Sequence, residues 1–289
     1  MAEVLTATDA PATGPAETAN ANANAEVMAL SPLGEVFRDI ARGGIAGIIV
    51  GILVAGLGGR LVMRLATILH EDTVGLRTEN GEVIGRISFD GTMALITFGG
   101  LGAGLLAGVI WVIVGPWIPG RGLRRAAVTA LAAIALGTPS LIQRTNRDFF
   151  ILGHDPVVVA LLVGLVGAVG FFIALVDGWL DRRLPRAAAG VRISKAAYLI
   201  VTLLGLVLIL PLALATLLAQ PEYRAAIRAG WALLVVGLCT LAWWALRVKG
   251  RASPPRWLAL TGRGALLVAV VLGVVTSLPH IRRATGMPW

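Results

Sequence analysis

Long runs of apolar residues that carry no charge are the feature that most restricts what this chain can fold into. A helix needs about 20 such residues to cross ~30 Å of hydrocarbon, and inside lipid every backbone amide must bond within its own segment. Each run is therefore predicted to be a transmembrane helix. Hydropathy predicts seven spans, at residues 43–69, 91–118, 125–142, 156–180, 196–220, 226–246 and 257–279. The third is the least regular, because it is rich in Ala and is interrupted at residues 137–140.

The composition excludes several classes of soluble protein. Of the 289 residues, 57% are hydrophobic and 14% are charged, whereas soluble domains carry about 45–50% apolar and ~25% charged residues. A soluble enzyme, a disulfide scaffold and a nucleic-acid-binding domain are therefore not expected. The net charge of +9 comes mostly from Arg in short loops beside the apolar runs, which is typical of membrane orientation rather than of nucleic-acid binding.

The distribution of Lys and Arg predicts the orientation of the chain. With seven spans, 15 of the 25 basic residues lie on the side of the N-terminus and 10 lie on the other side. Basic residues in short loops favour the cytoplasmic side of a membrane. We therefore expect a multi-pass protein of the cell membrane whose N-terminus is cytoplasmic and whose C-terminus is extracytoplasmic.

Short segments outside the helical bundle complete the predicted organisation. Residues 1–30 include an alternating Asn–Ala string and are predicted to be a disordered cytoplasmic tail. Residues 31–42 place apolar side chains at helical spacing opposite charged ones, which indicates an amphipathic helix lying in the membrane interface. The transmembrane bundle then takes residues 43–280, and residues 281–289 form a short C-terminal tail.

An external insert is predicted between the first two spans, at residues 70–90. Asn80 and Gly81 supply the residue types of a type I′ turn, so residues 76–84 are predicted to form a small extracytoplasmic β-hairpin. A hairpin alone is marginally stable in water. We therefore expect this one to rest on the outer loops.

Small residues recur at every fourth position of the first span, and a similar series occurs in the second. The first series is Gly43, Gly47, Gly51, Ala55 and Gly59, and the second is Gly100, Gly104 and Gly108. Small residues allow two helix backbones to approach closely. We predict that the two spans pack against each other through these faces within one chain; a dimer seam is the alternative.

A polar cluster is predicted at the outer side of the bundle. Its candidate members are Arg60, Arg64, Glu79, Glu82, Arg144, Arg147 and Asp148. Charge inside a membrane is costly and is usually paired, so the two Arg of the first span could bind carboxylates of the hairpin. The simpler alternatives are that these Arg extend to the interface, and that the loop at residues 143–150 only caps the third span.

The sequence contains no arrangement of residues typical of catalysis. All three His, at positions 70, 154 and 280, fall on the predicted outer side, but their spacing matches no metal-ligand motif. We therefore expect neither a metal nor a cofactor, and no enzymatic activity. Asp177 is interpreted as an interfacial residue beside Asp181.

Three short motifs lie near the ends of the predicted spans. They are Gly59-Arg60-Leu61-Val62-Met63-Arg64, the Thr78-Glu79-Asn80-Gly81 turn with Gly91-Thr92 after it, and Arg147-Asp148-Phe149-Phe150-Ile151-Leu152. These motifs resemble a family of uncharacterised bacterial multi-pass membrane proteins over roughly residues 43–180. The resemblance implies a hairpin between the first two spans and implies no particular activity.

The expected role is that of a non-enzymatic membrane component that binds a partner or a lipid-like ligand through the outer hairpin and loops. The alternative is a channel or facilitator for a small solute, with Arg60 and Arg144 near its entrance. The lipid bilayer is the expected environment, and another membrane protein or a second copy of the chain is the expected partner. A polar cavity at the midplane would favour the channel.

Overall fold

The computed structural model describes residues 32–70, 74–76, 89–142, 155–186, 196–200, 202–203 and 224–285. These residues form helices and the turns between them, and contain no strand. The predicted hairpin turn at Asn80 and Gly81, the tail at residues 1–30 and most of the fifth predicted span lie outside the described residues.

The first long helix is continuous but changes its winding midway. Helix α2 (Pro32–Val50) passes into a π-helical stretch, η1 (Gly51–Gly56), and then into α3 (Leu57–Leu69). The structure differs here from the separate interfacial helix predicted at residues 31–42, because the chain runs straight from Pro32 into the first span. The charged side of this segment faces α8 rather than water, as described below.

The second long helix has the same composite form. It comprises α4 (Phe89–Ala94), a π-helical stretch η3 (Leu95–Gly102), and α5 (Ala103–Val114), and it ends in a 3₁₀ turn, η4 (Gly115–Trp117). Pro116 lies within that final turn. Proline has no N–H to continue an α-helical ladder, so its position is consistent with the end of the helix here.

Four further helices complete the described bundle. They are α6 (Gly122–Leu141), α8 (Pro156–Arg183), α10 (Arg224–Val248) and α11 (Arg256–Ala284). The interruption predicted at residues 137–140 does not end α6, which continues through Pro139. Helix α8 begins at an Asp–Pro pair: the Asp155 side chain accepts a hydrogen bond from the Val157 N–H at 2.7 Å, as an N-capping residue does.

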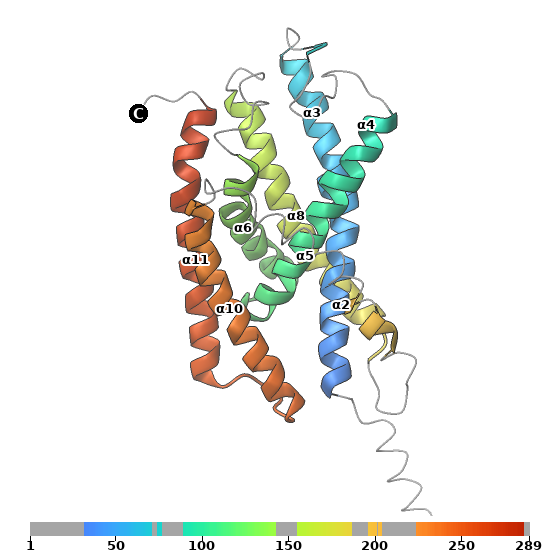
Figure 1. Ribbon diagram of the computed structural model, residues 1–289, viewed down its shortest axis with the longest axis vertical. Helices are drawn as coiled ribbons and strands as arrows, with labels where there is room; N and C mark the ends of the chain where they lie inside the picture. Colours follow the sequence, from blue (N-terminus) through green and yellow to red (C-terminus); the bar gives the residue numbers. More distant parts are fainter. Residues whose placement is uncertain are drawn as a thin grey trace, which may run out of the picture.

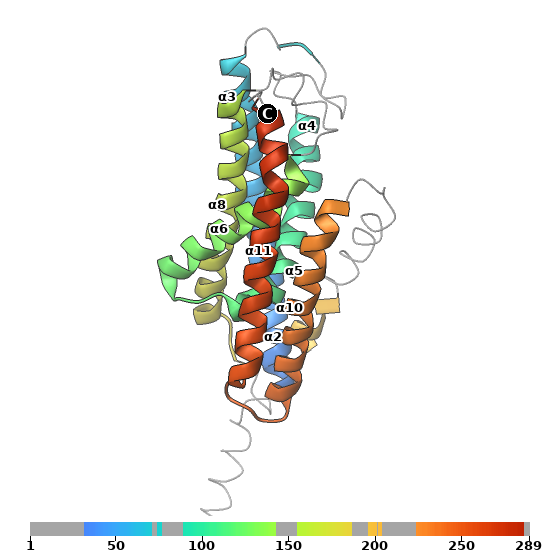
Figure 2. The ribbon, with the colours of Figure 1, turned by 90° about the vertical axis from the view of Figure 1, so that its left-hand side faces the viewer.

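The helices form one elongated bundle with distinct lower and upper ends. Figure 1 shows α2 and α3 crossing α4 and α5 in an X, with α10 and α11 side by side at the opposite flank. Figure 2 shows α6 lying obliquely; it packs against α8 and α11. We call the end where α2 begins and α10 ends the lower end, and the end where α3 ends and α8 begins the upper end.

Five helical stretches of the described chain are long and apolar enough to cross a membrane. They are Pro32–Leu69, Gly91–Trp117, Pro156–Arg183, Gly230–Val248 and Arg256–Ala284. Helices α8 and α10 both run toward the lower end (Figures 1 and 2). Two spans in the same direction need one further crossing of the membrane between them, and the span predicted at residues 196–220 would be that crossing. The count of seven spans stays a prediction.

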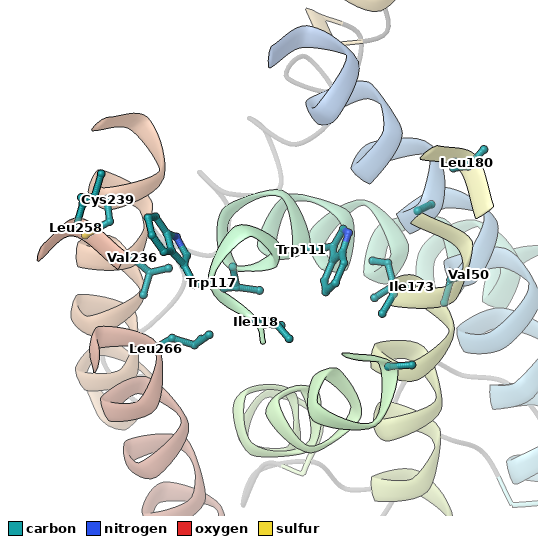
Figure 3. Close-up of a cluster of buried hydrophobic side chains, with 14 residues drawn as sticks. Val50, Trp111, Trp117, Ile118, Ile173, Leu180, Val236, Cys239, Leu258 and Leu266 are labelled. Atoms are coloured by element: carbon teal, nitrogen blue, oxygen red, sulfur yellow. The ribbon is translucent and has the colours of Figure 1, made fainter. Parts of the chain in front are cut away.

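The apolar core lies along the bundle axis and is organised around two indole rings. Figure 3 shows Trp117 lying toward Val236 and Leu258 of α10 and α11, while Trp111 lies toward Ile173 of α8. All five of these side chains are buried. The second composite helix therefore connects the α10–α11 pair to the rest of the bundle through its last two turns.

Candidate functional site

Eight charged residues from four helices meet near the lower end of the bundle. The set, which we call the charged cluster, consists of Glu35, Arg38, Asp39 and Arg42 of α2, Arg125 of α6, Asp177 and Asp181 of α8, and Arg247 of α10. Arg38 and Arg42 are four residues apart on α2, so they share a face of that helix, and Asp177 and Asp181 share a face of α8 in the same way. The positively charged face of α2 meets the negatively charged face of α8.

Arg38 binds the C-terminal end of α8. Its guanidinium donates to the Asp181 carboxylate at 2.9 Å, and also to the backbone carbonyls of Asp181 at 2.7 Å, Leu184 at 3.1 Å and Pro185 at 3.2 Å. The last carbonyls of a helix have no partner within it and carry partial negative charge. A cation that is only 3% exposed is thereby satisfied, and α2 is fixed to α8.

Asp177 is the most buried carboxylate of the charged cluster, at 2% exposure. It accepts a hydrogen bond from Arg42 Nε at 2.6 Å, and its second oxygen lies 3.8 Å from Arg125. Arg42 also pairs with Asp181. Because a buried charge without a partner costs several kcal/mol, these contacts explain how α8 tolerates an acid in its packed face.

Arg247 brings α10 into the same network. It pairs with Asp39, and its other terminal nitrogen lies 4.0 Å from Glu35. Helix α2 is thus joined to α8 on one side and to α10 on the other through charged groups. The formal charges of the cluster balance, with four guanidinium groups and four carboxylates.

A cavity of about 240 Å³ opens beside the charged cluster. Its lining residues are Asp39, Arg42, Trp111, Val112, Gly115, Pro116, Trp117, Arg125, Asp177, Trp243, Trp244 and Pro254. The cavity is larger than the ~150 Å³ engineered cavity that accepts benzene. Charged groups form one part of its wall, and four indole rings form another.

Arg125 is the least saturated cation of the charged cluster. Its guanidinium lies 4.7 Å from the centre of the Trp111 ring and donates one hydrogen bond, to the Gly115 carbonyl at 2.8 Å. Its Nε atom is buried and has no hydrogen-bond partner among the described residues. The side chain as a whole is 26% exposed, so its terminal N–H groups, one of which donates to Gly115, are the donors that an acceptor in the cavity can reach.

The arrangement is suited to holding a charged amphiphile. Guanidinium groups bind phosphate and carboxylate oxygens, and indole rings bind both apolar chains and cations. Trp117 is held in the wall by a hydrogen bond from its Nε1 to Thr240 Oγ1 at 2.8 Å. The binding groups therefore sit on packed helices rather than on loops.

The sequence-predicted outer cluster is represented in the described residues only by its first two members. Arg60 is half-buried and Arg64 is exposed, both on α3. Glu79, Glu82, Arg144, Arg147 and Asp148 lie outside the described residues, so their pairing with these Arg stays a prediction.

One polar link at the upper end is described. His70 Nε2 lies 2.8 Å from Asp155 Oδ2 and connects the end of α3 to the start of α8. The hydrogen bond from the Val157 N–H lowers the pKa of the Asp155 carboxyl, and the contact with His70 lowers it further. Neither residue was expected to pair with the other, since the sequence places them 85 positions apart.

The structure brings most of the two series of small residues together. Gly47 lies against Gly104 and Gly108, and Gly51 lies against Gly100 and Gly104. Gly43 also takes part, since its carbonyl oxygen would lie 3.0 Å from a Cβ atom built at Gly108, and its own side faces Trp111 and Val112 of α5. Ala55 is half-buried, and Gly59 faces side chains of α8 and η3.

Sequence reasoning missed the charged cluster. It assigned the charged side of residues 31–42 to the membrane interface and interpreted Asp177 as an interfacial residue. A usable signal was present: Arg38 and Arg42 on one helix, and Asp177 and Asp181 on another, are both spaced by one turn and both lie at the predicted cytoplasmic ends of their spans.

Comparisons with known proteins add no family. No protein-family model, no curated protein and no solved structure matches this chain.

Proposed function

We propose that this chain is a non-enzymatic component of the membrane that binds a lipid-like ligand in the cavity beside the charged cluster, with the lower end of the bundle in the cytoplasm. The proposal keeps the class of function expected from the sequence. It moves the site from the outer hairpin and loops to the lower end, where the described residues offer a cavity with binding groups.

The depth of the cavity supports a ligand that belongs to the bilayer. About 32 Å separate Pro156 from Asp177 along α8, at ~1.5 Å per residue, which is close to the ~30 Å thickness of hydrocarbon. A bilayer that begins at the upper end of α8 thus ends at the level of Asp177. Trp and Arg are the side chains that favour this headgroup level.

Arg125 carries the proposal. It is a cavity-lining cation whose partly exposed guanidinium donates one hydrogen bond among the described residues, to Gly115, and it is already positioned by the Trp111 ring. An anionic headgroup oxygen would supply a further acceptor. The binding role is favoured over the channel because the buried residues of α2 and η1 above the charged cluster are Gly, Ala and Val, which provide no polar surface toward the midplane.

The test is lipid binding by the purified full-length protein. Native mass spectrometry in a neutral detergent should detect bound phospholipid, and in a lipid titration Arg125→Gln should raise the dissociation constant about tenfold, the effect of losing roughly 1.4 kcal/mol of a charge-assisted contact. Arg124→Gln is the matched control, because its side chain is adjacent in sequence, exposed and outside the cavity lining. Equal lipid binding by the two variants would contradict the proposal.

A further inference from the structure

We infer that the ligand of this cavity is a zwitterionic phospholipid, with its phosphodiester on Arg125 and its ammonium group against the indoles of α10. The inference rests on the proposed function and adds the headgroup class. It follows from the charge balance and from the chemistry of the two walls of the cavity.

The charge balance selects a ligand without net charge. Three cations of the charged cluster, Arg38, Arg42 and Arg247, are in direct contact with carboxylates. Arg125, whose nearest carboxylate in the cluster is 3.8 Å away, brings the formal charge of the cluster to zero. An anionic headgroup would give the charged cluster a net negative charge, and repulsion from the carboxylates that already line the cavity, Asp39 and Asp177, would oppose its binding. A zwitterion leaves the cluster neutral.

The anionic part of the headgroup belongs on the α6 side of the cavity. The Cζ atom of Arg125 lies 4.7 Å from the centre of the Trp111 ring, and its partly exposed terminal N–H groups donate one hydrogen bond among the described residues, to Gly115. A phosphodiester oxygen accepts such a hydrogen bond and replaces no contact that Arg125 already makes. The other cavity-lining cation, Arg42, is occupied by Asp177 and Asp181.

The cationic part belongs on the α10 side. Trp243 and Trp244 line the cavity there; the neighbouring Asp39 carboxylate is already paired with Arg247 and Arg42. Aromatic rings bind ammonium and quaternary ammonium groups through their negative faces. The walls therefore offer an acceptor surface for a cation opposite the donor for an anion, which is the order of charges in phosphocholine and phosphoethanolamine.

A headgroup series on the unmodified protein tests the inference directly. Phosphatidylcholine, phosphatidylethanolamine, phosphatidylglycerol, phosphatidic acid and diacylglycerol with identical acyl chains would be titrated onto the full chain in a neutral detergent, with native mass spectrometry as the readout. The two zwitterionic lipids should bind about tenfold more tightly than the two anionic ones, a difference of roughly 1.4 kcal/mol. Diacylglycerol should bind most weakly.

A variant pair assigns the cationic part of the headgroup. Trp244→Leu should reduce the preference for zwitterionic over anionic lipids severalfold and leave the dependence on Arg125 intact. Trp231→Leu is the matched control, because Trp231 lies on the same helix, is 66% exposed and does not line the cavity. Loss of the preference in both variants alike would overturn the assignment to the α10 wall.

The outcomes separate this inference from the proposed function. If anionic lipids bind as tightly as zwitterionic ones and Arg125→Gln weakens both, the headgroup inference is overturned and lipid binding stands. If diacylglycerol binds as well as any phospholipid and Arg125→Gln leaves phospholipid binding unchanged, no headgroup contacts Arg125 and both are overturned. Soluble phosphocholine and phosphoethanolamine form a separate arm, and binding of either as tightly as the matching lipid would overturn the bilayer as the source of the ligand.

Discussion

Asp177 illustrates how a single carboxylate can be accommodated at the edge of a membrane-spanning helix. Its side chain is buried among α2, α6 and α8, where an isolated anion would be strongly unfavourable. Arg42 supplies a direct charge-assisted hydrogen bond, and Arg125 supplies a second positive charge at a longer distance. The residue therefore acts as the point to which two other helices are attached.

Replacing this carboxylate should be among the most destabilising single changes in the bundle. We expect Asp177→Asn to reduce the free energy of unfolding in mixed micelles by about 3–5 kcal/mol, because it leaves Arg42 partly unpaired in a buried site. Arg182→Gln, a change at an exposed position of the same helix, should stay within about 1 kcal/mol of the original protein. A loss of similar size in both variants would contradict the structural role of Asp177.

At the scale of the helices, the crossing of the first two spans depends on backbone contact rather than on side chains. A Cβ atom built at Gly47 would lie 2.6 Å from the Gly108 Cα, and a Cβ atom at Gly44 would have no neighbour within 4 Å. The two π-helical stretches, η1 and η3, pack against each other just above this contact. The close approach thus coincides with the segments where both helices are locally widened.

A pair of Gly→Ala substitutions tests this crossing. Gly47→Ala should lower the free energy of unfolding by about 1–3 kcal/mol, because the added methyl group forces the two backbones apart. Gly44→Ala on the same helix should be neutral or should raise stability by up to ~1 kcal/mol, since Ala is the better helix former. The measurement is unfolding of each variant in the same detergent. Destabilisation by Gly44→Ala of equal size would show that the contact at Gly47 is not the cause.

The pairing of α3 with α8 at the upper end should depend on pH. Because the pKa of Asp155 is lowered in the folded protein, its contribution to stability is full above the unfolded value of 3.8 and is lost as the pH falls through the lower folded value. Thermal unfolding measured between pH 3 and pH 6 should therefore show a loss of stability at the acid end.

A variant that caps the helix without a carboxylate provides the control. Asp155→Ser retains an N-cap hydroxyl for Val157 and removes the titrating group, so the pH dependence should be smaller than in the original protein. Asp155→Ala removes both and should be the least stable of the three at pH 6. An identical acid response in the original protein and in Asp155→Ser would rule out Asp155 as its source.

At the scale of the whole molecule, the described helices carry exposed leucines and valines along most of their length, including Leu61, Leu131, Leu260 and Leu267 at 60% exposure or more. A soluble protein rarely exposes so continuous an apolar surface. The charged cluster lies near one end of this surface, so we expect the bilayer to cover the rest. The orientation that places the charged cluster in the cytoplasm is the one that the excess of basic residues predicts.

Single-cysteine labelling tests that orientation. In a Cys239→Ser background, Val74→Cys at the upper end should react with a membrane-impermeant maleimide in intact cells, and Ser253→Cys between α10 and α11 should react only after permeabilisation. Both positions are exposed, so accessibility within the protein does not limit the reaction. The reverse pattern would place the charged cluster outside the cell and would exclude a cytoplasmic-leaflet ligand.

The sequence predicted the helical class, and its spacing of small residues predicted which faces of the first two spans pack together, because both features depend on periodicity within one segment. It did not predict the charged cluster, because the partners of Arg38 and Arg42 lie some 140 residues away along the chain and no local pattern reports which helix ends meet. Nor did it predict the link between His70 and Asp155, for the same reason. To predict contacts between helices that are far apart in sequence, one must know which helices pack side by side.

The attachment of Arg38 and Arg42 to α8 has a consequence for biosynthesis. Arg38 leaves the ribosome 143 residues before Asp181, which at ~5–20 residues per second is a delay of roughly 7–30 seconds. During that interval Arg38 and Arg42 have only Glu35 and Asp39 of their own helix as charged partners, so these four charged groups must stay in contact with water or lipid phosphates at the translocon exit. This requirement would hold the amino-terminal end of the helix on the cytosolic face until the fourth segment arrives and completes the ion pairs.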